Sequence, residues 1–236
     1  MIEFHVGCSG WFYLHWNSLF YPSNLNKRRW FEYYSERFNT VEINSTFYSM
    51  PDAKRVIKWY KMSPKNFIFS VKANRYITHI QKLNDCTDTL NTFLGAIKNL
   101  NEKLAFILYQ MPPSFKYTDE NLERILNNIP AGGIVEFRHR RWFDMNIIKN
   151  IIANGIHVAS VSSKDLPLIF PDDNIIYFRL HGDENGYATD YSSNKLKAFY
   201  NEIINIKPEK AFIYFNNDYN AMAPKNALEM LNIING

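Results

Sequence analysis

The chain has 236 residues, of which 46% are hydrophobic and 21% charged, and its formal net charge is +4. This is the composition of an ordinary globular protein, and the length fits one large domain or two small ones. No apolar run approaches the roughly 18 residues that a membrane-spanning helix needs, so we expect no membrane partner. The mildly basic charge permits an anionic ligand without demanding nucleic acid.

The two cysteines, Cys8 and Cys86, lie far apart, and neither belongs to a CxxC pair. We expect both to be reduced thiols. The first residues lack the basic and then apolar segments of a signal peptide. Both features favour a cytoplasmic protein.

Runs of β-branched and aromatic residues alternate with helical patterns along the whole chain. Asp52, Thr87, Asp119 and Ser192 are start signals for four of the helices. The predicted strands cover residues 4–9, 40–44, 67–72, 104–110, 134–138, 156–161, 175–181 and 211–216, and the predicted helices cover 26–37, 52–62, 87–101, 119–128, 144–154, 192–205 and 222–234.

Strands that alternate with helices indicate a parallel sheet. Eight such units, in a chain close to the usual length of about 250 residues, predict a closed (β/α)8 TIM-like barrel. An open doubly wound sheet is the alternative, although its nucleotide-binding form is weakened by the missing GxGxxG motif. We see no linker, low-complexity tract or repeat, and therefore predict a single domain over residues 1–236.

In a barrel, side chains alternate between the interior and the helix layer. If the apolar residues of each strand face the helices, a set of polar residues faces inward. These polar residues stand near the carboxyl ends of their strands, where barrel enzymes have their active sites. They are Glu42, Asn44, Lys72, Gln110, Glu136, Arg138, Arg179, His181 and Asn216.

The segment 134–138 illustrates the choice between a site and a structural network. Glu136 and Arg138 share one face of an apolar strand, where charges are costly unless they are paired or used. A buried ion pair that fixes strand order would explain this one strand. Because the same pattern recurs on several strands, we favour a functional site over an inert ion network.

The motifs at these positions resemble the YecE-like family, domain of unknown function 72. The resemblance runs in the same order through nearly the whole chain, and Cys8, where threonine is common, and a short loop after His181 are mild departures. The matching motifs are GCSGW at 7–11, VEINSTFY at 41–48, FSVKA at 69–73, QMPPSF at 110–115, EFRH at 136–139, RLHG at 179–182 and YFNN at 214–217. The resemblance implies a TIM-like barrel and supplies no function, because the family is uncharacterised.

The inward set contains more cations than anions, which favours an anionic ligand. Arginine binds phosphate or carboxylate through a planar fork, and lysine acts as a point charge. Barrels often hold phosphate at the loops after the last two strands, which begin here at His181 and Asn216. Glu42 and Glu136 would be general bases if their pKa values were raised. Alternatively, Glu42–Lys72 and Glu136–Arg138 or Glu136–Arg179 pairs only orient the site.

We predict catalytic roles for Glu42, Lys72, Glu136 and His181. Aromatic residues in the loops after strands would wall the pocket or pack over its mouth. The predicted substrate-binding residues are Trp11, Asn44, Tyr48, Gln110, Arg138, His139, Arg179, Asn216 and Asn217. We predict no cofactor and assign no metal ligands; a divalent metal is possible, but HExxH and Cys-rich spacings are missing and cations are nearby.

Two functions from different classes follow. The first is an enzyme that uses acid–base chemistry on a small anionic substrate, which includes phosphorylated compounds. The second is a nucleic-acid-binding protein, or a metal-dependent nuclease, indicated by the basic and aromatic runs RHRRW at 138–142 and KRRW at 27–30. Lys27, Arg28 and Arg29 also fit a solvated first helical turn, which we prefer for them.

Overall fold

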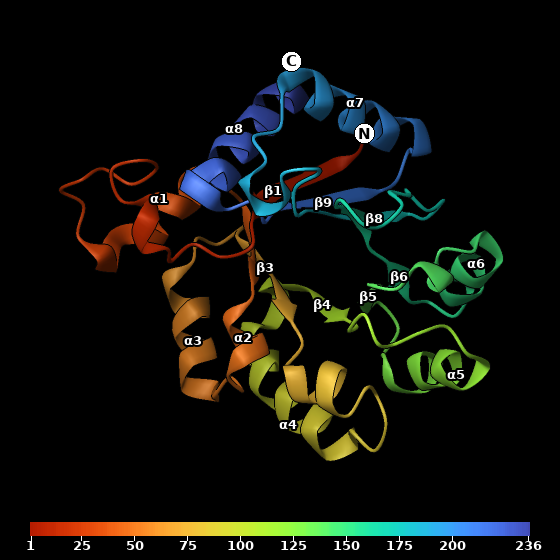
Figure 1. Cartoon of the computed structure of the whole chain (residues 1–236). Helices are drawn as coiled ribbons and strands as arrows, with labels where there is room; N and C mark the ends of the chain where they lie inside the picture. Colours follow the sequence, from red (N-terminus) through yellow and green to blue (C-terminus); the bar gives the residue numbers. More distant parts are fainter. The chain divides into compact units, whose positions relative to one another are not determined.

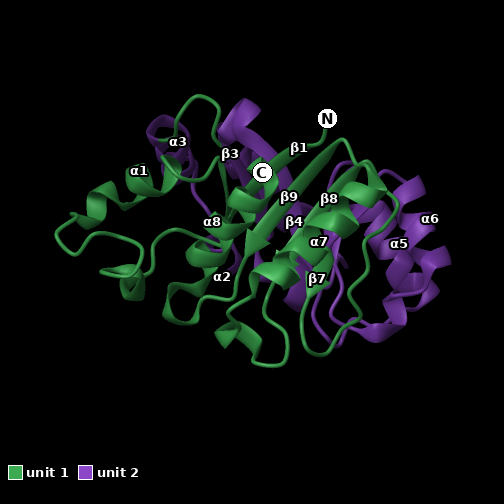
Figure 2. Cartoon of the chain, turned by 90° about the horizontal axis from the view of Figure 1, so that it is seen from above, with its two compact units in different colours: residues 1–42, 63–67, 160–236 green, residues 43–62, 68–159 purple.

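The computed structural model describes all residues, 1–236, and contains nine strands and eight α-helices. The chain divides into two compact units that interleave along the sequence (Figure 2). Unit 1 comprises residues 1–42, 63–67 and 160–236, and unit 2 comprises residues 43–62 and 68–159. The prediction of a single domain stays a prediction.

The sheet of unit 1 has four parallel strands with apolar, buried centres. α7 (Ser193–Ile206) and α8 (Met222–Asn235) pack on each other, and α8 lies against two of these strands (Figure 1). Burial under helices explains why the strands are nearly continuous apolar runs. Their order is β1 (Glu3–Cys8), β9 (Lys210–Phe215), β8 (Ile175–Leu180) and β7 (Ser160–Ser162).

The second sheet has the order β2-β3-β4-β5-β6. The neighbouring strands from β3 to β6 pair in parallel, and Gln110 of β4 lies opposite Glu136 of β5. The strands are β2 (Thr40–Ile43), β3 (Ile68–Lys72), β4 (Leu104–Gln110), β5 (Ile134–Glu136) and β6 (His157–Val158). The division between the units falls within β2, after Glu42.

The parallel α/β class predicted from the sequence is confirmed. The sixth predicted strand is divided in two, because the backbone of Ala159 bonds to Val135 of the second sheet, whereas Ser160 begins β7 of the first. The strands therefore form two hydrogen-bonded sheets, and closure into one eight-stranded barrel stays a prediction.

Most predicted helices are present with similar bounds. They are α1 (Trp30–Ser35), α3 (Ala53–Met62), α4 (Thr87–Ile97), α5 (Asp119–Asn128) and α6 (Met145–Ala153), besides α7 and α8. One short helix, α2 (Ser45–Tyr48), was not predicted. α4 ends four residues before the predicted residue 101 and continues as a 3-10 turn, in which Asn101 has φ 49°. None of the helices has the length and apolar character that crossing a bilayer requires.

Two of the four predicted helix starts are confirmed by their capping hydrogen bonds. The side chain of Asp52 accepts from the backbone N–H of Arg55 at 2.9 Å, and that of Ser192 accepts from Lys195 at 3.3 Å. The other two were placed one residue late. The cap of α5 is Thr118, not Asp119, and α4 follows Cys86, which makes no side-chain cap.

Candidate functional site

Most of the polar residues predicted at the strand ends form two clusters, one in each unit, and Ser9 and Tyr177 join the first of them. The buried cluster of unit 1 comprises Ser9, Glu42, Tyr177, Arg179, His181 and Asn216. The second cluster, in unit 2, comprises Lys72, Gln110, Glu136 and Arg138. Both clusters form because the strands of each sheet are parallel. The last residues of neighbouring parallel strands lie at the same edge of the sheet.

An ion pair between Glu42 and Arg179 forms the centre of the buried cluster. Arg179 donates from Nε and Nη2 to the two carboxylate oxygens of Glu42 at 2.9 and 2.6 Å. Ser9 and Tyr177 donate to the same carboxylate at 2.8 and 2.7 Å. Both charged side chains are completely buried, and the pair is bidentate, the strongest geometry for such a contact.

This environment decides the protonation state of Glu42. Burial favours the neutral acid, but the charge of Arg179 and the hydrogen bonds from Arg179, Tyr177 and Ser9 outweigh it and hold the pKa of Glu42 below its usual 4.5. A general base near neutral pH needs a raised pKa. The condition that we set for Glu42 to act as a base is therefore not met, and the carboxylate is a fixed anion.

The lowered pKa of Glu42 predicts a pH-dependent stability. The contribution is fully present above pH 4.5, the usual pKa of the group, and is lost as the pH falls through the lowered value. Glu42→Gln should therefore cost about 3–5 kcal/mol of unfolding free energy at pH 7 and progressively less below pH ~4, because the wild type loses the same charge there.

Urea unfolding at pH 7, 5, 4 and 3 measures this difference. Glu120→Gln is the control, because Glu120 is exposed and pairs with Arg124 on one helix face, where such pairs contribute little. A Glu42→Gln deficit of the same size at every pH would show that the ionised carboxylate is not what stabilises unit 1.

His181 is held by hydrogen bonds at both ring nitrogens. Its Nε2 lies 3.0 Å from Nη1 of Arg179, and its Nδ1 lies 2.8 Å from the side-chain amide of Asn216. Because arginine only donates, Nε2 accepts and the proton resides on Nδ1. The Asn216 atom 2.8 Å from Nδ1 is placed as Nδ2, so this proton requires the amide to be turned until its Oδ1 faces the ring. His181 cannot accept a proton at Nε2 without losing Arg179, which disfavours the predicted catalytic role.

Two predicted substrate-binding residues of unit 1 have other contacts. Asn217 is buried, and its amide nitrogen donates to the Thr189 carbonyl and to Asn226 Oδ1, both at 2.8 Å. Asn217 therefore links the loop at Thr189 to α8, and its amide nitrogen is used in hydrogen bonds within the fold. Trp11 is half-buried, and its ring packs edge-on against Phe31 at 5.0 Å.

The cluster of unit 2 is a hydrogen-bonded chain across three strands. Lys72, the last residue of β3, donates to Gln110 at 2.7 Å, and Gln110 donates to Glu136 at 2.7 Å. Nε of Arg138 lies 2.5 Å from the same oxygen of Glu136. The predicted Glu136–Arg138 pair is thus confirmed. Glu136 is completely buried, whereas Lys72, Gln110 and Arg138 are half-buried.

Further groups surround Lys72. Its ammonium lies 4.2 Å from the ring centre of Phe47, a cation–π distance, and His79 meets the same ring edge-on at 4.9 Å. Burial, together with the charges of Lys72, Arg75 and Arg138, lowers the pKa of His79 to about 4. We call Lys72, Arg75 and Arg138 the basic cluster.

The remaining predicted ligands of unit 2 lie around this cluster with different exposure. Asn44 is half-buried and precedes α2. Tyr48 is 76% exposed and packs edge-on against Phe47 at 5.0 Å. His139 caps a 3-10 turn, because its Nδ1 accepts from the backbone of Arg141 at 3.2 Å. Of these, Tyr48 has the most accessible side chain.

Comparison with known proteins identifies the family. A family model described as "Protein of unknown function DUF72" matches residues 5–236. The chain belongs to the DUF72 family. The UPF0759 protein YunF of Bacillus subtilis (strain 168) is 25% identical, over 98% of this chain and 94% of that protein. The UPF0759 protein YecE of Escherichia coli (strain K12) is 28% identical over 56% of this chain and 49% of that protein.

Solved structures of DUF72 proteins have the same fold. A DUF72 family protein of Thermotoga maritima MSB8 superposes with a TM-score of 0.88 at 27% identity and covers 99% of this chain and 100% of its own. A DUF72 family protein of Enterococcus faecalis V583 gives a TM-score of 0.83 at 20% identity, over 99% of this chain and 96% of its own. The resemblance found in the sequence motifs is confirmed.

Sequence reasoning missed several residues that complete the two clusters of this DUF72 protein. Tyr177 shares the strand face of Arg179, two residues away, so the period of two that identified Arg179 was a signal for it. Ser9 and Phe47 lie inside the motifs quoted above, but their partners follow only from the fold. No pattern distinguished Arg75 from other exposed arginines.

No group of three or more His, Cys, Asp or Glu side chains is close enough together to hold a metal ion. The aromatic loops mostly pack: Trp16 and Trp142 are fully buried, and Trp142 stacks on Phe137 at 4.3 Å. Packing over the strand ends therefore explains these two better than a pocket wall does.

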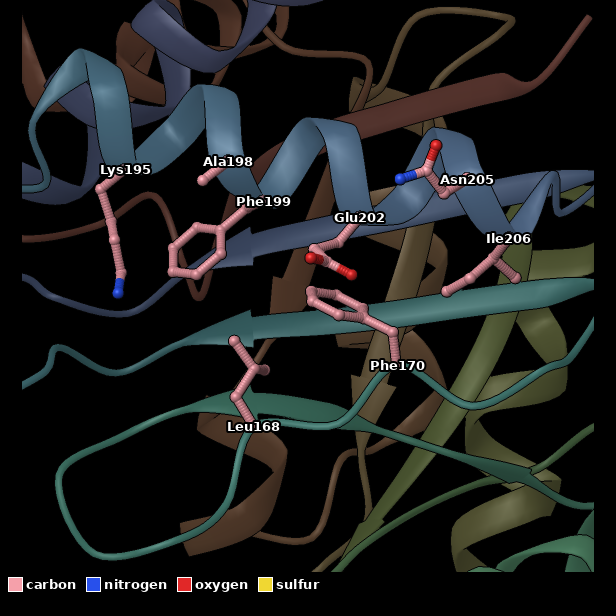
Figure 3. Close-up of a pocket in the computed structure, with 8 residues that line it drawn as sticks. All are labelled: Leu168, Phe170, Lys195, Ala198, Phe199, Glu202, Asn205 and Ile206. Carbon is pink, nitrogen blue, oxygen red and sulfur yellow. The ribbon is translucent and has the colours of Figure 1, made fainter.

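A groove of about 510 Å³ lies beside α7 in unit 1 (Figure 3). Phe170 and Leu168, from the loop between β7 and β8, face α7 across it. None of the predicted site residues lines this groove. Its other lining residues are Lys195, Ala198, Phe199, Glu202, Asn205 and Ile206.

Proposed function

We propose that this DUF72 protein is an enzyme that binds an anionic substrate at the basic cluster of unit 2. The supporting observation is that two half-buried cations, Lys72 and Arg138, lie in one hydrogen-bonded chain with the fully buried carboxylate of Glu136. Two accessible cations held in fixed positions by a hydrogen-bonded chain suit a phosphoryl or carboxylate group. Burial is the largest cause of the lowered pKa of His79, and the charges of Lys72, Arg75 and Arg138 lower it further.

The chemistry that we propose is acid–base catalysis. Lys72 polarises the bound anion, and Gln110 links its ammonium to the carboxylate of Glu136. Glu42, Arg179 and His181 position the strand ends of unit 1 and do not exchange protons with the substrate. Hydrolysis, isomerisation and elimination all use such groups. We also propose that the alternating parallel strands and helices close into a (β/α)8 barrel with a cytoplasmic location.

A thermal-shift screen tests the anion site. Phosphate, sugar phosphates, nucleotides and carboxylates are each compared with the neutral parent compound, with and without Mg²⁺, Mn²⁺ or Zn²⁺. A ligand at about 100 times its Kd stabilises by about 2.7 kcal/mol, which raises the Tm by several degrees. The proposal is supported if phosphorylated compounds raise the Tm and their neutral parent compounds do not. It is contradicted if no anion raises the Tm.

A second candidate function is nucleic-acid binding. Arg140 and Arg141 are both exposed and directly follow Arg138 and His139, so they extend the basic surface into solvent. If they contact phosphates, Arg140→Ala with Arg141→Ala should weaken binding to a short oligonucleotide and reduce the slope of log K against log salt by about 2.

Fluorescence anisotropy at several salt concentrations measures that slope. Lys27→Ala with Arg28→Ala is the control pair, because it removes two exposed cations at the start of another helical turn. If the Arg140/Arg141 double variant has the same oligonucleotide affinity and the same salt slope as the wild type, this candidate function loses its main support.

A further inference from the structure

His79 lies in a π-helical turn, Tyr76–Ile80, between β3 and α4. Such turns are rare and are often found at functional sites. The Phe47 ring contacts both the imidazole of His79 and the ammonium of Lys72, at 4.9 and 4.2 Å. One aromatic side chain thus places a titratable ring beside the basic cluster.

Charged groups around His79 come from several elements. Lys72 lies at the end of β3, Arg75 precedes the turn, and Arg138 follows β5, and all three charges oppose protonation of the ring. α2 contributes the uncharged Phe47. α4, which also packs against the turn, has Asp88 as its one charged residue, exposed in the first turn.

Within the turn, Nδ1 of His79 lies 2.9 Å from the hydroxyl of Thr78. A hydroxyl both donates and accepts, so it can rotate to accept from Nδ1 when both ring nitrogens carry protons. This hydrogen bond therefore permits the imidazolium form, which burial and the repulsion from the three cations both oppose, and a bound anion would relieve the repulsion.

We propose that an anion bound at the basic cluster is accompanied by one proton, which solvent delivers to the imidazole of His79. The imidazolium then joins Lys72, Arg75 and Arg138 around the anion. This inference rests on the proposed anion site and extends it, because the coupling favours a dianion over a monoanion: a second negative charge offsets more of the cationic repulsion.

The coupling has a quantitative consequence. The pKa of His79 is about 4 without a ligand, against a usual 6.5. Burial is the largest cause of this shift, and a bound dianion does not remove it, so a full return to 6.5 is the upper limit. The affinity should therefore be up to about tenfold higher at pH 5.5 than at pH 7.5. At pH 6, binding should take up at most about three quarters of a proton.

Isothermal titration calorimetry with inorganic sulfate tests this inference on the full chain. Sulfate stays a dianion throughout this pH range, so protons taken up must go to the protein. Titrations at pH 6 in two buffers of different ionisation enthalpy give the number of protons. His79→Gln should abolish the uptake and the pH dependence. His157→Gln should retain both, because His157 lies at the start of β6, at the opposite end of the strands.

The outcomes separate the two proposals. Sulfate that binds without proton uptake, or with uptake that persists in His79→Gln, would overturn the role of His79 and leave the anion site standing. Sulfate that fails to bind at any pH would overturn both. A His79 ring resonance that shifts on sulfate addition in wild-type NMR spectra at pH 6 identifies the titrating group directly, even if His79→Gln folds poorly.

Discussion

Arg179→Ala should destabilise the protein by about 3–5 kcal/mol, because it leaves the buried carboxylate of Glu42 without its counter-charge. Nε, Nη1 and Nη2 of Arg179 all contact Glu42 or His181, and the side chain is completely inaccessible. The substrate-binding role predicted for Arg179 would need an access to its side chain that this burial does not offer.

Urea unfolding at pH 7 measures this loss. Arg124→Ala is the control, because Arg124 forms an exposed pair with Glu120 and should lose less than about 1 kcal/mol. The double variant Glu42→Gln with Arg179→Met should lose less than the sum of the single losses, since neither partner is left as a buried lone charge. An Arg179→Ala protein as stable as the wild type would disprove the assigned positioning role.

Lys72→Met should weaken anion binding about 10- to 100-fold, the effect of losing one charge-assisted hydrogen bond. Methionine has a similar length and lacks the charge, so it can still fill the space beside Phe47, and the fold should be retained. Arg138→Lys keeps the charge beside Glu136 but loses the planar fork, and should weaken binding by a smaller factor.

Lys103→Met is the matched control for Lys72→Met. Lys103 also lies over an aromatic ring, 4.7 Å from the ring centre of Tyr60, but immediately before β4, at the amino end of that strand. Anion affinity from calorimetry should be unchanged in this variant. Equal losses in both lysine variants would indicate a nonspecific effect of net charge and contradict a site at Lys72.

The sequence predicts much of the fold because its signals are local. The period of two in strands such as β8, and capping residues such as Ser192, act within a few residues of their own position. The kink that follows α4 was missed because it lies at Asn101, whose φ of 49° is not helical, and asparagine tolerates a positive φ without requiring it.

The sequence predicted which residues belong to the site but not which of them contact one another. The strand pattern placed Glu42, Lys72, Glu136 and Arg179 near strand ends. The pairing of Glu42 with Arg179, however, depends on which strands have neighbouring ends in the fold. The pKa directions could not be foreseen either, because that of Glu42 depends on hydrogen bonds from Ser9 and Tyr177. The prediction that both clusters serve one barrel mouth stays a prediction.

Crystals soaked in selenate or tungstate would test the central claim most directly. Both are tetrahedral dianions that scatter anomalously, so their positions follow without reference to side-chain density. We predict an anomalous peak within hydrogen-bonding distance of Lys72 Nζ and the guanidinium of Arg138, and its loss in Lys72→Met crystals. Peaks that avoid this cluster, or that are unchanged in Lys72→Met, would contradict the proposed anion site.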